Sequence, residues 1–456
     1  MKRYMNKKIS LWLQTCLLVM LAISCKNAAQ PGTDPFLAKV KVDSLLEFTC
    51  SSDTTQHYAV YQPTGYTPAK KWPVVYAFDP HADGKLPLLK MREAAERFGY
   101  ILVGSDNFRN GVANLNGIAA ALFEDVEKRY SIDAQRVYLA GFSGGARAAA
   151  NIAFSNKGIR GLILSGAGIQ DFNASYKSSG MVVYAMAGRN DFNMQESLAM
   201  EKELEGLGIP HYVAIFNGKH EWPPVTSLNQ AFLWISFQAM QAKLIPADKS
   251  LVSWFAHASD SIANHMMSEG RPMDALEQYT LARSALQSLY PVKEFEKKAE
   301  AITVTGAYKK ALQEQESYAA MEQKLQQEYA AAFLSNDEKW WTNELAVLNG
   351  KCNTEKDPVK LGVYNRLKGF LGIAAYSFTS RAVHAGDLTD ARKLVSVYRL
   401  IEPSNPDVTY YQALIYDKEG NPAKAAATLK EAIKNGLGDK GRIPGDSSPE
   451  VQKALQ

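Results

Sequence analysis

Cysteine is scarce in this sequence, with four residues in 456. Two of them, Cys16 and Cys25, fall in an apolar stretch at the N-terminus, so Cys50 and Cys352 remain for the body of the chain. These two stand far apart, which predicts free thiols instead of a disulfide framework. Neither belongs to a cluster with metal-binding spacing, and we expect no metal and no organic cofactor.

The sequence also has little excess of one charge over the other. The chain has 51 Lys and Arg against 47 Asp and Glu, a net charge of +4. The sequence has no basic cluster beyond its first eight residues, so it gives no reason to expect nucleic acid as a partner. The length exceeds what one hydrophobic core usually serves, and two domains are expected.

Long apolar runs are missing as well. Residues 9–23 are mostly apolar, but the run is too short and too interrupted to be a comfortable membrane span. It follows a basic start and ends in Ser24-Cys25. In this it resembles a bacterial lipoprotein signal, in which Cys25 is lipidated and becomes the new N-terminus. We expect a signal peptide over 1–24 and a polar tether with a lead-in over 25–54.

From this N-terminus we expect a protein of the bacterial cell envelope that is attached to the membrane by a lipid anchor. An ordinary secreted or periplasmic protein and an uncleaved anchor are the alternatives. Further along, strands alternate with helices over 55–243, whereas 250–456 has helical periodicity and almost no strand signal. The stretch 244–249 is predicted to be a linker at which the two halves can be separated.

The first half predicts an α/β fold with a doubly wound, mostly parallel sheet. Because strands alternate with helices, both faces of the sheet are expected to be covered. In such sheets the functional loops gather beyond the carboxyl ends of the strands. The predicted strands are 58–62, 72–78, 100–104, 136–140, 159–164, 181–187 and 210–216, and the predicted helices are 86–98, 118–130, 146–154, 195–207 and 225–240.

One of these strands runs into a Gly-x-Ser-x-Gly motif at 141–145, and an Ala-rich helical segment follows. A strand, a sharp turn with Ser at its tip and a helix form a nucleophile elbow. The residues two places either side of the Ser must be small, because the turn brings the neighbouring strand and helix close. The helix N-terminus then directs its N–H groups at charge that develops on a substrate oxygen.

Two later strand ends complete a pattern. Gly-Arg-Asn-Asp stands at 188–191, and Gly-Lys-His-Glu-Trp-Pro stands at 218–223. With the elbow, these motifs make residues 55–243 resemble an α/β-hydrolase, nearest to the feruloyl esterase and polyhydroxybutyrate depolymerase branch. The resemblance implies a catalytic triad in the chain order Ser, Asp, His.

The resemblance assigns the triad to Ser143 as nucleophile, His220 as base and Asp191 as the acid that orients His220. Asp171 is the alternative acid, because some members of the fold carry it after the preceding strand. Gly144 is expected to supply one oxyanion N–H. The second is expected from the backbone of His81, where the chain departs from the usual His-Gly of the family. Three further residues are expected to line the pocket: Asp106, Arg109 and Trp222.

The second half is expected to be an all-α domain over 250–456. Gly420 follows Gly386 by 34 residues, which is the period of a tetratricopeptide repeat. The resemblance to tetratricopeptide repeats covers 374–435 and, more weakly, 254–287. Such helices either offer a concave surface to a protein partner or pack on the first half. A Gly followed by an Ala five residues later recurs at Gly270/Ala275, Gly386/Ala391 and Gly420/Ala425.

These observations predict a cell-envelope serine hydrolase that acts on small or polymeric carboxylic esters. Two other functions stay open at this point. One is a serine peptidase, because the same triad cleaves amides on this fold. The other is a binding protein that works mainly through its helical repeats, although the presence of Ser143, Asp191 and His220 together argues against an idle site.

Overall fold

The computed structural model describes residues 45–170, 180–438 and 443–454. Cys25, the signal peptide and Asp171 lie outside the described residues. Within the described part, no helix has the length and apolar character needed to cross a membrane. Cys50 and Cys352 are free thiols, as expected.

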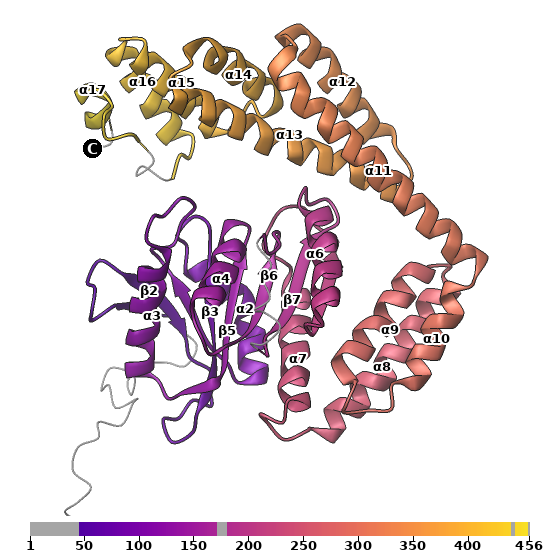
Figure 1. Ribbon diagram of the computed structural model, residues 1–456. Helices are drawn as coiled ribbons and strands as arrows, with labels where there is room; N and C mark the ends of the chain where they lie inside the picture. Colours follow the sequence, from indigo (N-terminus) through magenta and orange to yellow (C-terminus); the bar gives the residue numbers. More distant parts are fainter. Residues whose placement is uncertain (1–44, 171–179, 439–442, 455–456) are drawn as a thin grey trace, which may run out of the picture.

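An eight-stranded sheet forms the centre of the first half (Figure 1). Its strand order is β1-β2-β4-β3-β5-β6-β7-β8. Strand β2 pairs antiparallel with both β1 and β4, and β3 to β8 run parallel to one another. The expected fold class is thereby confirmed, with one unpredicted strand, β1. The strands are β1 (Leu46–Thr49), β2 (His57–Tyr61), β3 (Trp72–Phe78), β4 (Ile101–Ser105), β5 (Ile132–Phe142), β6 (Ile159–Ser165), β7 (Val182–Gly188) and β8 (His211–Phe216).

Helices cover both faces of this sheet, because the strands carry apolar side chains on both sides. One face packs on α2 (Lys85–Phe98) and α7 (Val225–Gln241). The other packs on α3 (Leu115–Arg129), α4 (Gly144–Ser155) and α6 (Met194–Leu207). Every residue of β3 and β7 is buried, which is the pattern of central parallel strands.

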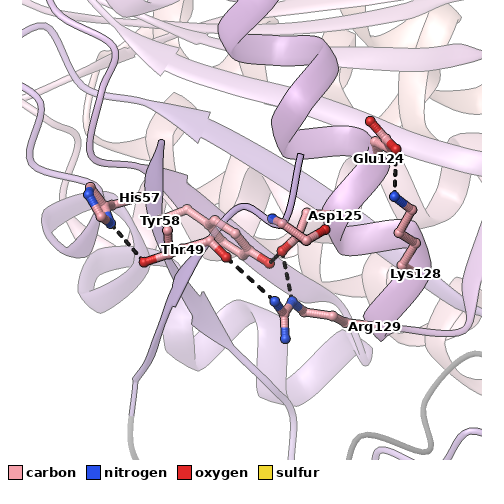
Figure 2. A network of polar contacts seen from close by, with 8 residues as sticks. Thr49, His57, Tyr58, Glu124, Asp125, Lys128 and Arg129 are labelled. Atoms are coloured by element: carbon pink, nitrogen blue, oxygen red, sulfur yellow. Dashed lines mark hydrogen bonds and ion pairs between the residues drawn. The ribbon is translucent and has the colours of Figure 1, made fainter. Parts of the chain in front are cut away.

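A buried carboxylate ties the N-terminal hairpin to α3 (Figure 2). Asp125 accepts hydrogen bonds from Tyr58 Oη at 2.6 Å, Arg129 Nε at 2.7 Å and the backbone and side chain of Ser51. Burial works to raise the pKa of Asp125, but the Arg129 guanidinium and the other donors outweigh it and lower the pKa to about 2. The hairpin formed by β1 and β2 is therefore anchored by an ionised group.

Three helices extend the core on the α7 face: α8 (Lys249–Ser268), α9 (Pro272–Leu286) and α10 (Lys293–Thr303). Phe255 and Phe295 belong to the same apolar cluster as Trp234 of α7 and Tyr184 of β7. The Trp234 indole also donates to Ser284 Oγ at 3.0 Å. These helices follow the predicted linker, yet they share the core of the first half.

The remaining helices form an arch that Figure 1 shows in orange to yellow. They have an apolar core of their own, centred on residues such as Trp341 and Tyr398. The arch consists of α11 (Gly306–Ser335), α12 (Glu338–Thr354), α13 (Pro358–Ala385), α14 (Leu388–Ile401), α15 (Pro406–Lys418), α16 (Pro422–Lys434) and the short α17 (Pro449–Lys453).

The recurring Gly and Ala positions have a common geometry. Gly270, Gly386 and Gly420 adopt φ values of 70°, 75° and 77°, the left-handed region in which Gly commonly ends a helix. The three Ala residues that follow are fully buried where the next helix packs on its predecessor. This pattern joins α8 to α9, α13 to α14 and α15 to α16, so each of the three signals marks a helical hairpin.

Candidate active site

The turn after β5 has the strained shape that the sequence predicts. Ser143 has φ 52° and ψ −120°, an unfavourable backbone conformation for a residue with a side chain. A Cβ on Gly141 would overlap the Gly145 backbone, and a Cβ on Gly145 would overlap the carbonyl of Phe78. Both positions therefore require Gly, and α4 begins directly at Gly144.

His220 lies between Ser143 and Asp191. Its Nε2 is 2.9 Å from Ser143 Oγ, and its Nδ1 is 2.9 Å from Asp191 Oδ1. A neutral imidazole with its proton on Nδ1 donates to the carboxylate and accepts from the hydroxyl. The rings of Phe142 and Phe192 pack beside the imidazole, with centroids 4.7 and 4.3 Å away. The structure thus brings together the three residues selected from the sequence, at the ends of β5, β7 and β8.

Asp191 is fully buried and held by its own loop. Its Oδ1 accepts a second hydrogen bond, from Asn193 N at 2.8 Å, and its backbone N–H donates to Gly188 O. Among the described residues, Oδ2 has no hydrogen-bond partner. The arrangement leaves Oδ1 to orient His220, as an acid in a triad does.

The arch touches the loop that carries Asp191, a contact that sequence reasoning missed. Arg366 of α13 donates from Nη1 to the Arg189 carbonyl at 2.7 Å. The same guanidinium makes two hydrogen bonds to Glu322 of α11, at 2.9 and 2.7 Å, and both side chains are buried. Charged residues in a helical segment usually face solvent, so the sequence contained no signal for this pair.

A second ion pair joins α4, the helix that follows Ser143, to α6. Arg147, one turn into α4, makes a bidentate contact with Glu196 of α6 at 2.7 and 2.9 Å. Glu196 Oε1 also accepts from Gly168 N, which joins the loop after β6 to the same group. Burial works to raise the pKa of Glu196, but the hydrogen bonds and charge of Arg147 lower it overall. The sequence analysis did not identify this pair.

The loop after β3 differs from the expectation for the oxyanion hole. Pro80 has no N–H, and the His81 N–H donates to Asp79 Oδ1 at 2.9 Å. The Ala82 N–H is directed at the Asp79 carbonyl at 3.2 Å. In this arrangement the His81 N–H is therefore already occupied, whereas Gly144 stands at the start of α4 as expected.

Asp79 also explains the position of Trp222. The buried indole donates to Asp79 Oδ2 at 2.7 Å, so Trp222 joins two loops. Burial works to raise the pKa of Asp79, but hydrogen bonds from His81 and Trp222 lower it overall. The carboxylate in turn raises the pKa of the exposed His81 imidazole through their hydrogen bond.

The other two expected pocket residues lie on one loop. Asp106 accepts from Gly84 N at 2.9 Å, and burial raises its pKa. It therefore holds the start of α2 in place. Arg109 is exposed and forms a backbone bridge with His81, which brings the loops after β3 and β4 together.

The described residues contain no group of His, Cys, Asp and Glu that could hold a metal ion. The site consists of a hydroxyl, an imidazole and a buried carboxylate in hydrogen-bond contact, beside a helix N-terminus. Chemically, this arrangement can activate a hydroxyl nucleophile and stabilise an oxyanion.

Comparison with known proteins finds no matching family model and no matching curated protein. Solved structures with similar folds cover less than half of this chain. The fluorophosphonate-binding serine hydrolase FphF of Staphylococcus aureus is 12% identical, with a TM-score of 0.36 over 42% of this chain and 97% of its own. A ferulic acid esterase is 16% identical, with a TM-score of 0.37 over 41% and 95%. An esterase from the archaeon Pyrobaculum calidifontis is 13% identical, with a TM-score of 0.35 over 45% and 88%. At this level the comparisons concern the fold and do not bear on activity.

Proposed function

We propose that this protein is a serine hydrolase that cleaves carboxylic esters through an acyl-enzyme. The observation that carries the proposal is the continuous contact from Ser143 Oγ through His220 to Asp191, with 2.9 Å at each step. A hydroxyl is a poor nucleophile unless a neighbouring base takes its proton. Ser143 has such a base, and the base has its orienting carboxylate.

The mechanism follows from these positions. Ser143 Oγ attacks the ester carbonyl carbon while its proton passes to His220 Nε2, and the carbonyl electron pair moves to oxygen. The Gly144 N–H stabilises that oxyanion. When the tetrahedral intermediate collapses, the alkoxide leaves with the proton from His220. Water then repeats the sequence on the acyl-enzyme, releases the acid and restores Ser143.

A panel of short acyl, feruloyl and acetyl-sugar esters, assayed beside dipeptide amides, tests this proposal. We expect ester turnover and labelling of the wild-type protein by a fluorophosphonate probe. Ser143→Ala should abolish both. Labelling without ester turnover, together with cleavage of the amides, would favour a peptidase. A wild-type protein that shows neither labelling nor turnover would refute the serine hydrolase.

The acid is tested separately. Asp191→Asn keeps the shape of the side chain but favours the wrong imidazole tautomer. We expect it to lower turnover by about a hundredfold or more, about 2.7 kcal/mol of transition-state stabilisation. Asp171→Asn is the matched control and should cost little. If Asp171→Asn proves the damaging change, the acid is reassigned and the hydrolase proposal stands.

The cellular setting belongs to the same proposal. A basic start, a short apolar run and Ser24-Cys25 support an envelope protein whose Cys25 is lipidated. One acyl chain binds a membrane only marginally, so stable attachment requires several. Membrane fractionation and mass spectrometry of the mature N-terminus test this. An unmodified Cys25, or cleavage elsewhere, would exclude the anchor.

The helical hairpins support a role in binding a protein partner, in the manner of tetratricopeptide repeats. Three hairpins share the Gly and Ala geometry, and two of them lie in the arch. Affinity capture with the full-length protein, compared with Trp341→Ala, in which the arch core is weakened, tests this role. A partner retained equally by both proteins would argue against the arch as its binding site.

A further inference from the structure

The occupied N–H of His81 raises the question of what completes the oxyanion hole. One donor, the Gly144 N–H, follows from the elbow itself. The neighbouring loop contributes Pro80, which has no N–H, and His81, whose N–H is bonded to a buried carboxylate. If the His81 N–H turned to a substrate, the buried Asp79 carboxylate would lose a hydrogen bond, which is costly. A donor from another element is therefore required.

Asn110, on the loop after β4, has its side-chain amide against Gly144. A Cβ on Gly144 would overlap Asn110 Oδ1 and come within 3.2 Å of its Nδ2. The amide therefore occupies the space that a side chain at position 144 would fill. Gly144 immediately follows Ser143 and carries the backbone donor.

The backbone holds Asn110 in this position. Its N–H donates to the Pro80 carbonyl at 3.0 Å, and the preceding residue, Arg109, forms a bridge with His81. The loop after β3, which offers no free N–H at Pro80 or His81, therefore holds the backbone of Asn110 in place. The side chain of Asn110 is exposed, so a substrate can reach it.

An Asn side chain suits this role chemically. Its amide carries two N–H donors and no charge, and rotation about the Cβ–Cγ bond exchanges the places of oxygen and nitrogen. The structure places Oδ1 nearer than Nδ2 to the space beside Gly144, and an oxyanion there would select the rotated amide, which presents Nδ2. A donor of this kind acts on charge that exists only in the transition state.

We infer that the Asn110 side-chain amide is the second oxyanion donor of this site, in place of a backbone N–H from the loop after β3. The inference rests on the proposed serine hydrolase. It makes Asn110 a catalytic residue and explains why position 144 is Gly: a side chain there would displace the amide.

Asn110→Ala is the first test, with an activated acetyl ester as substrate. Loss of one oxyanion donor costs roughly a hundredfold to a thousandfold in kcat. We expect a loss of that size in kcat with little change in KM, because the oxyanion is absent from the ground state. Asn110→Asp, which places a carboxylate there, should lose more. Asn114→Ala is the matched control: it removes an exposed Asn that caps α3 on the same segment and should keep kcat.

Gly144→Ala sharpens the test, because it keeps the backbone N–H and adds a methyl group where the amide lies. Alone it should lower kcat about as much as Asn110→Ala. In the Asn110→Ala background the methyl has room, so the double variant should resemble the single ones. Additive losses, or an Asn110→Ala variant within threefold of wild type, would overturn the inference. An inactive wild-type protein would instead overturn the proposed function.

Discussion

Two groups of helices follow the sheet, and they are attached to it in different ways. Helices α8 to α10 share one apolar cluster with α7 and the sheet, including Phe255, Trp234 and Tyr184. Helices α11 to α17 have a separate cluster around Trp341. They reach the first half through polar contacts, among them the bond from Arg366 to the Arg189 carbonyl. The first group contributes apolar burial, and the second contributes directed hydrogen bonds near the site.

This difference bears on where the chain divides. The change of periodicity in the sequence predicts a boundary at 244–249, but the apolar core continues across that stretch. We propose that the physical boundary lies after α10, at about residue 305, because the clusters separate there. The two groups then differ in their contacts: α8 to α10 share the apolar core of the sheet, and the arch contacts the Asp191 loop.

The largest expected effect comes from truncation. A chain of residues 26–243 would expose the Trp234 face of α7 to water and lose the hydrogen bond to Ser284. We expect this fragment to be insoluble. A chain of residues 26–305 should fold and retain ester turnover at a reduced rate. Soluble yield, circular dichroism and turnover of the two fragments check this prediction. A folded, active 26–243 fragment would place the boundary at the linker after all.

Substitution of one buried Trp in each core comes next. Trp234→Ala and Trp341→Ala should each cost about 3–5 kcal/mol, the range for removing a large buried ring. The consequences should differ, because the two rings belong to separate cores. Trp234→Ala should lower the temperature at which turnover is lost, whereas Trp341→Ala should melt the arch first. Calorimetry beside a thermal inactivation curve separates the two, and a single shared transition in both variants would contradict separate cores.

The contact between the arch and the site is the third test. Arg366→Met leaves Glu322 buried without its cationic partner, with Gln195 Nε2 at 3.3 Å as its remaining donor, which costs about 3–5 kcal/mol. Adding Glu322→Leu should recover most of the stability, yet the bond to the Arg189 carbonyl stays lost. Turnover that remains low in the stable double variant would identify Arg366 as a positioning residue.

Arg392 supplies the control for that test. Its ion pair with Glu419 lies in the same arch, but the Arg392 side chain is largely exposed. Arg392→Met should cost about 1 kcal/mol or less. If the double variant at 366 and 322 recovers full turnover, the arch contact is structural only.

The smallest expected effect depends on pH. Tyr212 of β8 donates to Glu277 of α9 at 3.3 Å, and burial raises the pKa of Glu277 to about 7. The pKa of Glu in an unfolded chain is about 4.3. The folded state therefore binds the Glu277 proton more tightly than the unfolded state does. The stability that this proton contributes is fully present at pH values below the pKa of the unfolded chain, and it is lost as the pH rises through about 7.

Glu277→Gln should remove that dependence. At pH 8 we expect the variant to unfold roughly 2–4 °C higher than the wild type, for a gain of about 1 kcal/mol, and at pH 5 the difference should vanish. The arch transition serves as internal control, because Glu277 contacts β8 and not the arch core. An equal shift at both pH values would assign the effect to packing instead of the proton.

Much of the site was accessible from the sequence because its signals are local. The Gly residues at 141 and 145 are demanded by the turn between one strand and the next helix. Asp191 and His220 each stand directly after a predicted strand, and parallel strands bring their carboxyl ends to one edge. Strand β1 was not predicted, and its side chains are only partly buried, which leaves a weak pattern.

Other parts of the site depend on contacts that no local pattern records. Arg366 and Arg189 are 177 residues apart, and Trp222 and Asp79 are 143 apart. The sequence shows an Arg on a helix and a Trp after a strand, but the hydrogen bonds depend on how those elements pack. The same holds for the core shared by the sheet and α8 to α10.

The sequence by itself determined the alternation of strands and helices, the elbow at Ser143 and the chain order of the three site residues. These follow from backbone sterics and from hydrophobic periodicity, which act between near neighbours. Tertiary structure alone decided that the His81 N–H is bonded to Asp79, that Asn110 lies against Gly144 and that the arch reaches the Asp191 loop. Each of these depends on which polar groups meet when distant segments pack, because a buried donor or acceptor must find whatever partner the fold brings to it.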